Sequence, residues 1–253
     1  MYTIKVLTHG MNVGSNQARL GLSSVILLQG EQNILVDVGH FGRRILLVES
    51  LEKEGLKTED ISSIILTHSH WDHCQNVDLF PNAKLYVHQK EIEYANNPRN
   101  NDWATPKYFN KTIENHNLSI ITQETEIEPG IQIIETPGHT RGHISVVVST
   151  NDGNTVIAGD SLTDAFSLQR GTPGLIFWSK KEASESVEKI RKIASVVYPG
   201  HDRPFAIKPN GEIEYKEGPT SVTFTGGFEN SESGFSATLN LEKTRVPWVH
   251  EEA

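Results

Sequence analysis

The chain has 253 residues, of which 36% are hydrophobic and 22% charged, a composition typical of one large folded domain or two small ones. Its formal net charge of -9 provides no overall basic field, so we expect no nucleic-acid partner. The single cysteine, Cys74, excludes an intrachain disulfide, and no apolar run approaches the roughly 18 residues that cross a bilayer. We therefore expect a cytoplasmic protein that does not enter a membrane.

Short apolar runs rich in valine and isoleucine predict β-strands. In chain order they cover residues 3–7, 24–28, 33–38, 61–66, 83–87, 131–135, 144–149, 155–158 and 195–198. Helical spacing predicts helices over 42–53, 89–95 and 182–194, the first from Ile45, Leu46, Val48 and Leu51. Many strands with few helices indicate sheets covered by outer helices, which is a layered α/β fold.

Two long segments, 96–117 and 161–180, interrupt these elements and are expected to be loops. Both carry aromatic residues, which either form a pocket wall or pack onto the core. The second segment is the better pocket candidate, with Phe177 and Trp178 as predicted substrate-binding residues. After Pro209 the sequence becomes acidic, with short strand-like runs at 222–224 and 237–241. We interpret 1–210 as one domain and 211–253 as an acidic β-like extension.

Four metal-ligating side chains follow the predicted strand 61–66 within the run Thr67-His68-Ser69-His70-Trp71-Asp72-His73. Imidazole nitrogens and carboxylate oxygens are suitable ligands for zinc, manganese or iron. If the start of this loop is extended, His68 and His70 point the same way, while Asp72 and His73 turn toward a neighbouring position. Chance placement does not account for three histidines among seven residues, so the run predicts a metal site.

The pattern His-x-His-x-Asp-His after a buried strand resembles the metallo-β-lactamase superfamily. Further motifs of that family follow in order: Leu35-Val36-Asp37-Val38-Gly39 before the histidine run, then Thr136-Pro137-Gly138-His139, Ala158-Gly159-Asp160 and Pro199-Gly200-His201 after it. The resemblance spans roughly residues 1 to 210 and implies an αββα sandwich, here with a short β-rich C-terminal extension. It further implies a first metal held by His68, His70 and His139, a second held by Asp72, His73 and His201, and Asp160 as the bridge between them.

Such a site would contain two divalent metal ions, with Zn2+ as the first choice and Mn2+ or Fe2+ as alternatives. Two metals about 3.5 to 4 Å apart share a water and lower its pKa toward about 7, so that a bridging hydroxide becomes the nucleophile. Three imidazoles leave a coordination position open for chemistry. Asp72 is the predicted catalytic residue, because it would orient this nucleophile and relay its proton.

Within the family, the chain resembles metallo-β-lactamase-domain-containing proteins, glyoxalase II and acyl-homoserine lactonases. It has Thr163 three residues after Asp160, where the lactonases carry tyrosine. From the resemblance to these hydrolases we predict a dinuclear metallohydrolase of a small ester, lactone or thioester. The alternative from another class is a mononuclear iron persulfide dioxygenase, which would use His68, His139 and Asp160 alone. The predicted partner is a small-molecule substrate, and a homo-oligomer is left open.

Three more residues lie beside these motifs. Cys74 is interpreted as a small buried thiol rather than a ligand. We expect His143, four residues after His139, to support the site without binding metal. Asp37 is expected to accept hydrogen bonds from loop backbone, outside the metal shell.

Overall fold

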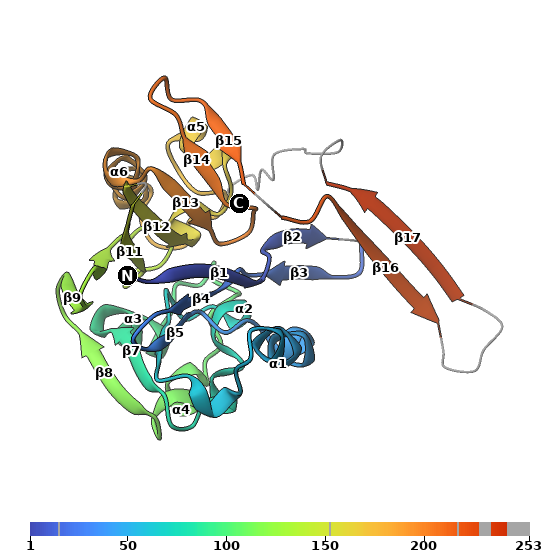
Figure 1. The fold of residues 1–253 in the computed structure, drawn as a ribbon, viewed down its shortest axis with the longest axis horizontal. Coiled ribbons are helices and arrows are strands. Elements are labelled where there is room, and N and C mark those ends of the chain that lie inside the picture. Colours follow the sequence, from blue (N-terminus) through green and yellow to red (C-terminus); the bar gives the residue numbers. More distant parts are fainter. Residues whose placement is uncertain (15, 152, 217, 228–233, 242–253) are drawn as a thin grey trace.

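Two β-sheets form the centre of the molecule in a computed structural model, which describes residues 1–14, 16–151, 153–216, 218–227 and 234–241 (Figure 1). The first sheet has six strands in the order β1-β4-β5-β6-β7-β8. Their bounds are β1 Thr3–Thr8, β4 Val25–Gln29, β5 Asn33–Val36, β6 Ser63–Ile65, β7 Lys84–His88 and β8 Asn117–Ile121. The strands β5, β6, β7 and β8 pair in parallel, so their C-terminal ends lie at the same edge of the sheet.

The second sheet has seven strands in the order β15-β14-β13-β12-β11-β10-β9. Their bounds are β9 Thr125–Glu128, β10 Ile131–Glu135, β11 Ile144–Thr150, β12 Gly153–Gly159, β13 Val196–Pro199, β14 Phe205–Ile207 and β15 Ile213–Tyr215. Only β12 and β13 pair in parallel in this sheet, which places the residues that follow them side by side. All the predicted strands are present, with small shifts at their ends.

The two sheets pack face to face through isoleucine- and valine-rich strands. On β4, Ile26 and Leu28 point into the layer between the sheets, whereas Val25 and Leu27 point to the outer face of the first sheet. This alternation follows from the two-residue period of a strand, and because both faces are covered the strand reads as a continuous apolar run. Ile133 and Val146 contribute to the same inner layer from the second sheet.

Helices cover the outer face of each sheet. The helices are α1 Arg44–Lys53, α2 Trp71–Cys74, α3 Gln89–Asn96, α4 Phe109–Ile113, α5 Phe166–Arg170 and α6 Lys180–Ile193, with short 3-10 turns η1 Phe41–Arg43, η2 Thr58–Asp60, η3 Val77–Leu79 and η4 Asp160–Leu162. Side chains of α1, α3 and α4 pack on the first sheet, and side chains of α5 and α6 pack on the second. The predicted αββα sandwich is confirmed.

The first predicted helix is present as α1, although Ile45 and Leu46, two of the residues that predicted it, do not belong to its buried face. Leu47 and Leu51, four residues apart, are fully buried, whereas Ile45 is 74% exposed and Leu46 52% exposed. The sequence has four consecutive apolar residues here, so spacing alone does not select a face. The two segments expected to be loops also contain helices, since 96–117 includes α4 and 161–180 includes α5.

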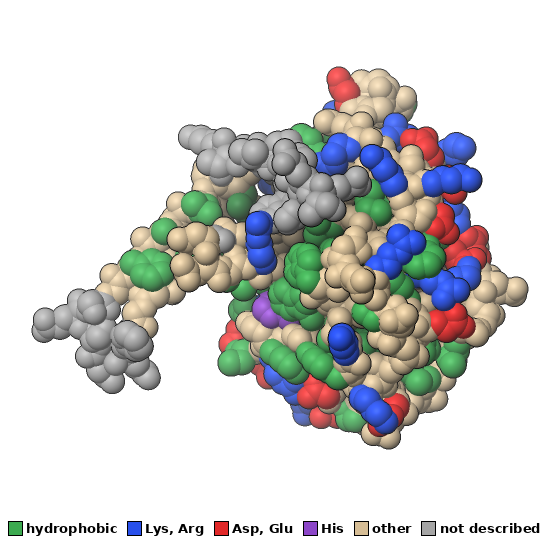
Figure 2. Space-filling view, turned by 180° about the vertical axis from the view of Figure 1, so that it is seen from behind, with side chains coloured by type: hydrophobic (Ala, Val, Ile, Leu, Met, Phe, Trp, Pro, Cys, Tyr) green, Lys and Arg blue, Asp and Glu red, His purple; other side chains and the backbone are tan. Residues whose placement is uncertain are grey.

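Two hairpins lie outside the sandwich. One consists of β2 (Met11–Gly14) and β3 (Arg19–Leu22), and the other of β16 (Ser221–Gly227) and β17 (Gly234–Asn240). The second projects from the body as an arm whose described side chains are uncharged (Figures 1 and 2). The predicted extension begins within the second sheet, because β15 is its edge strand. Among the described residues, no helix combines the length and apolar character needed to cross a membrane.

Candidate metal centre

The histidine run directly follows β6, a central strand of the first sheet whose three residues are buried. His68 and His70 lie in the extended start of the loop, and His70 precedes the first residue of α2, which runs from Trp71 to Cys74. The change from extended to helical backbone turns Asp72 and His73 away from the direction of the first two rings. One short loop therefore supplies candidate ligands to two neighbouring positions.

The second sheet supplies the remaining candidate ligands at the same edge. His139 lies between β10 and β11, Asp160 begins η4 directly after β12, and His201 follows β13. Close packing requires glycine beside them: a Cβ on Gly200 would lie 2.0 Å from Asp160 Oδ1. The small residues of the Ala-Gly-Asp and Pro-Gly-His motifs thus allow two strand ends to meet around one carboxylate.

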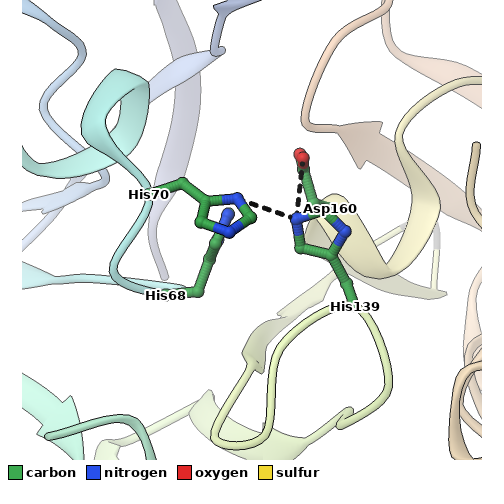
Figure 3. A group of neighbouring side chains, drawn as sticks. All are labelled: His68, His70, His139 and Asp160. Carbon is green, nitrogen blue, oxygen red and sulfur yellow. Dashed lines mark hydrogen bonds and ion pairs between the residues drawn. The ribbon is translucent and has the colours of Figure 1, made fainter. Parts of the chain in front are cut away.

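The first group of candidate ligands consists of His68, His70, His139 and Asp160, all buried, with their ligand atoms within 4.8 Å of one another. Figure 3 shows the four side chains pointing toward a common position, with His68 and His70 on one loop and His139 and Asp160 on two other segments. His139 Nε2 lies 3.0 Å from His70 Nδ1 and 3.3 Å from Asp160 Oδ2. The group therefore combines ligands from both sheets.

The second group consists of Asp72, His73 and His201, also buried and within 4.8 Å by their ligand atoms. Asp160 Oδ1 faces it, 3.4 Å from His73 Nε2 and 3.2 Å from His201 Nε2. Because Oδ2 of the same carboxylate faces His139, Asp160 has one oxygen toward each group. This is the arrangement of a bridging carboxylate.

The far nitrogen of each candidate histidine already has a protein partner. Those partners are Thr67 Oγ1 for His68, Asp102 Oδ2 for His70, Asp37 Oδ2 for His73, the Leu175 carbonyl for His139 and the Leu22 carbonyl for His201. Such contacts fix the ring and its tautomer, which leaves the near nitrogen for a metal.

Among the described residues, three buried atoms that point inward make no hydrogen bond, although two of them face each other at 3.4 Å as an ion pair: His68 Nε2, His73 Nε2 and Asp160 Oδ1. Unpaired buried polar atoms are costly, and these are nitrogen and oxygen donors of the kind that bind divalent transition metals. The residues therefore fit a metal centre.

Electrostatics differ between the two groups. Burial, reinforced by His73, lowers the pKa of His68 well below its usual range, and burial lowers the pKa of His139 to about 4. Burial also opposes charge on His73, but the carboxylates of Asp37 and Asp160 outweigh it and raise its pKa well above normal. Asp160 similarly raises the pKa of His201 against the effect of burial. In the metal-free chain the neutral imidazole is thus favoured at His68 and His139, whereas the protonated ring is favoured at His73 and His201.

Asp37 and His143 support the ligand loops. The Asp37 carboxylate accepts hydrogen bonds from Thr67 N at 2.8 Å and from Thr67 Oγ1, and it lies 2.7 Å from His73 Nδ1. Asp37 does this from a left-handed backbone conformation with φ 59°, which is unfavourable for a residue with a Cβ. Asp160 N donates to His143 Nε2, whose other nitrogen lies 2.9 Å from Thr136 Oγ1. Cys74 is a buried free thiol, 3% exposed.

Sequence reasoning did not identify two further buried carboxylates beside these loops, Asp102 and Glu91. Asp102 contacts His70, and Glu91 accepts hydrogen bonds from both ligand loops. Each is one acid among 32 acidic residues, in a segment without a motif. Only the fold reveals their position.

A cavity opens over the candidate ligands, and His70, Asp72, His139, Asp160 and His201 lie in its lining. Its walls come from three places: Val13 and Leu20 of the β2–β3 hairpin, Trp103 of segment 96–117, and Leu175 and Phe177 of segment 161–180. Both long segments therefore contribute to it. Gly21 allows the hairpin to approach the ligands, because a Cβ there would lie 2.4 Å from Asp72 Oδ2.

The two predicted substrate-binding residues have different surroundings. Phe177 lines the cavity, with its ring 5.1 Å from that of His70. Trp178 is not among the residues that line the cavity. The guanidinium groups of Arg99 and Arg141 lie 4.4 Å and 5.6 Å from the centroid of its ring. The position of Phe177 is consistent with a substrate contact, whereas the contacts of Trp178 are with these two arginines.

The family model of the metallo-beta-lactamase superfamily matches residues 18–201, which include every candidate ligand. The chain belongs to the metallo-β-lactamase superfamily. Metallo-beta-lactamase domain-containing protein 1 of Mus musculus is 34% identical over 179 residues, covering 69% of this chain and 61% of that protein. An N-acyl homoserine lactonase from a Bacillus species is 29% identical over 162 residues, 62% of each chain. A metal-dependent hydrolase acting on a small molecule is the class that these relatives indicate.

Solved structures share the fold of this superfamily member. The dizinc quorum-quenching lactonase AidC, in complex with a product, has a TM-score of 0.62 at 20% identity and covers 80% of this chain and 81% of its own. A Bacillus thuringiensis AiiA variant with N-decanoyl-L-homoserine bound at the active site has a TM-score of 0.60 at 23% identity, covering 73% and 82%.

Proposed function

We propose that this chain is a dinuclear metallohydrolase, most suited to zinc, that cleaves a small ester, lactone or thioester. The observation that carries the proposal is the position of Asp160, whose two carboxylate oxygens face the two separate groups of candidate ligands. A single ion needs only one such group. The second group, Asp72, His73 and His201, is buried as well.

Bound divalent metals would supply an acidified water as nucleophile and a Lewis acid for the substrate carbonyl. The chain's own part is to hold the reacting groups in place. Asp72 lines the cavity, with Oδ2 3.5 Å from His201 Nε2, so its carboxylate can orient an attacking water and accept its proton. The buried position of these groups strengthens each electrostatic contact with the reacting atoms.

The cavity walls favour an acyl group with an apolar substituent. Val13, Leu20, Trp103 and Phe177 surround the opening, and burial of their surfaces against a substrate chain stabilises the complex. The similarity to N-acyl homoserine lactonases supports a lactone among the candidate substrates. Thr163 lines the cavity three residues after Asp160, but its hydroxyl already accepts a hydrogen bond from Gly174 N. Among the described residues that line the cavity there is no tyrosine, so a substrate carbonyl would be oriented by another group.

The predicted alternative, an iron persulfide dioxygenase, would need only His68, His139 and Asp160. It leaves the assembly of the second group unexplained, and the relative described above whose name states an activity is a lactonase.

The deciding experiment quantifies metals on protein purified without added metal and then measures turnover of chromogenic esters, lactones, thioesters and a β-lactam. We expect two divalent ions per chain and hydrolysis of at least one acyl substrate. One iron per chain with oxygen uptake would replace this proposal by the dioxygenase. Two metals without turnover of any acyl substrate would overturn the substrate class.

A further inference from the structure

Glu91 is a buried carboxylate that the proposed reaction does not use. It lies in the first turn of α3 and is 1% exposed. Its Oε1 accepts hydrogen bonds from Ser69 N at 2.8 Å and Ser69 Oγ at 2.7 Å. Its Oε2 accepts hydrogen bonds from Thr140 Oγ1 at 2.8 Å and Gly142 N at 2.9 Å. Both oxygens are therefore satisfied by two donors each.

These donors belong to the two loops that carry the histidines of the first group. Ser69 lies between His68 and His70, and Thr140 directly follows His139. The first loop leaves the first sheet after β6, whereas the second connects β10 and β11 of the second sheet. One side chain thus joins ligand loops from the two halves of the sandwich.

The loop after His139 also packs directly on the helix that carries Glu91. A Cβ on Gly142 would lie 2.1 Å from Glu91 N, so the backbones are in close contact. Because a buried charge without partners is costly, the four donors and the carboxylate hold each other in one arrangement. A shift of either loop would leave one oxygen without its donors.

Glutamine at this position would have the same shape but the wrong chemistry. It has one carbonyl oxygen and one NH2 group, and the NH2 group would face a backbone N–H on either side. A backbone N–H cannot become an acceptor, so glutamine can satisfy one loop only. The carboxylate is therefore required to hold both loops at once.

We propose that Glu91 is a positioning residue that sets the distance between His139 and the His68–His70 pair and thereby the metal affinity of the first group. This inference rests on the proposed metal function. It assigns no contact between Glu91 and the metal or the substrate.

The test compares Zn2+ dissociation constants of metal-free wild type and Glu91→Gln, measured by competition with a chelating dye. Zn2+ binding to the first group should weaken about tenfold or more, in the range typical of residues that orient metal ligands. His201→Ala, which removes a ligand from the second group, identifies which dissociation constant belongs to the first. Binding to the second group should weaken less, whereas general loosening of the fold would weaken both equally and would contradict the proposal.

Glu93→Gln is the matched control, because Glu93 lies on the same helix and contacts Arg141 of the same loop from an exposed position. It should bind Zn2+ as the wild type does. If Glu91→Gln does not fold, Thr140→Val is measured instead, because it removes the hydroxyl that donates to Glu91 Oε2 and keeps the shape of the side chain. Weaker Zn2+ binding to the first group in this variant supports the proposal, and unchanged Zn2+ binding overturns it. Wild-type affinity in Glu91→Gln also overturns it. A wild type that binds metal without hydrolysing acyl substrates would refute the proposed function and leave this comparison intact.

Discussion

Asp102 contacts His70 on the side of the ring opposite to His139. Asp102 Oδ2 lies 3.3 Å from His70 Nε2, while His70 Nδ1 lies 3.0 Å from His139 Nε2. The same carboxylate accepts a hydrogen bond from the Tyr94 hydroxyl and from the backbone N–H groups of Ala104 and Thr105. Trp103, which lies between Asp102 and Ala104 in the sequence, lines the cavity. Asp102 therefore joins a wall of the cavity to a candidate metal ligand.

Asp102→Asn should lower metal affinity about tenfold or more, because this carboxylate fixes the ring of His70. The asparagine oxygen would stay with the two backbone donors, so its NH2 group would replace the acceptor beside His70 and Tyr94. Competition with a chelating dye measures the effect. Tyr94→Phe, which removes one donor and keeps the carboxylate, is the control and should bind metal more tightly than Asp102→Asn. Equal affinities in these two variants would count against the role of the carboxylate.

Asp160→Ala should abolish detectable turnover and reduce the metal content below that of the wild type. Without its carboxylate, no group links the two sets of ligands, and two cations would face each other without shared negative charge. Elemental analysis and the acyl-substrate assay provide the measurement. Asp164→Ala is a suitable comparison, since Asp164 also lines the cavity but pairs with Arg170. Full metal content and activity in Asp160→Ala would refute the dinuclear assignment.

Metal binding near pH 7 should release protons. The pKa of His73 is raised well above its usual value and that of His201 is raised, so both rings of the metal-free chain keep their protons to a higher pH than a free imidazole does. A metal needs the deprotonated rings, so its affinity should rise as the pH rises through the neutral range. Calorimetry in two buffers with different ionisation enthalpies measures the release. His201→Ala should release fewer protons, and an equal release from both proteins would show that His201 is not a source.

Phe177→Ala should raise KM or change substrate preference while metal content stays unchanged. Phe177 lines the cavity, so its removal takes apolar contacts from the substrate without removing a metal ligand. Trp178→Ala provides the matched comparison, because this ring is not part of the cavity lining and contacts Arg99, Arg141 and Tyr94 instead. It should change KM less than Phe177→Ala does. Melting temperatures of both variants separate lost binding from lost folding, and a larger KM effect of Trp178 would reverse the assignment.

The sequence alone predicted the parts of the molecule in which residue type is tied to local geometry. Apolar runs located nine strands of the sandwich but missed β8, β9, β14 and β15, and the histidine run after β6, together with the family resemblance, indicated the two groups of candidate ligands. The β2–β3 hairpin was missed, because each of its strands has four residues with two large apolar side chains, which is too short a run to stand out from a loop. Asp102 and Glu91 were missed for a different reason: their partners are distant in sequence, so only tertiary packing gives them a role.

The contact between Gly21 and Asp72 limits how the entrance of the cavity can be altered. Position 21 has no space for a side chain, since a Cβ would lie 2.4 Å from the carboxylate that the proposed reaction uses. Its neighbour Leu20 and the facing Val13 line the same cavity without that restriction. Variants intended to accept substrates of a different size should therefore change positions 13 and 20 and keep glycine at 21, where even alanine would displace Asp72.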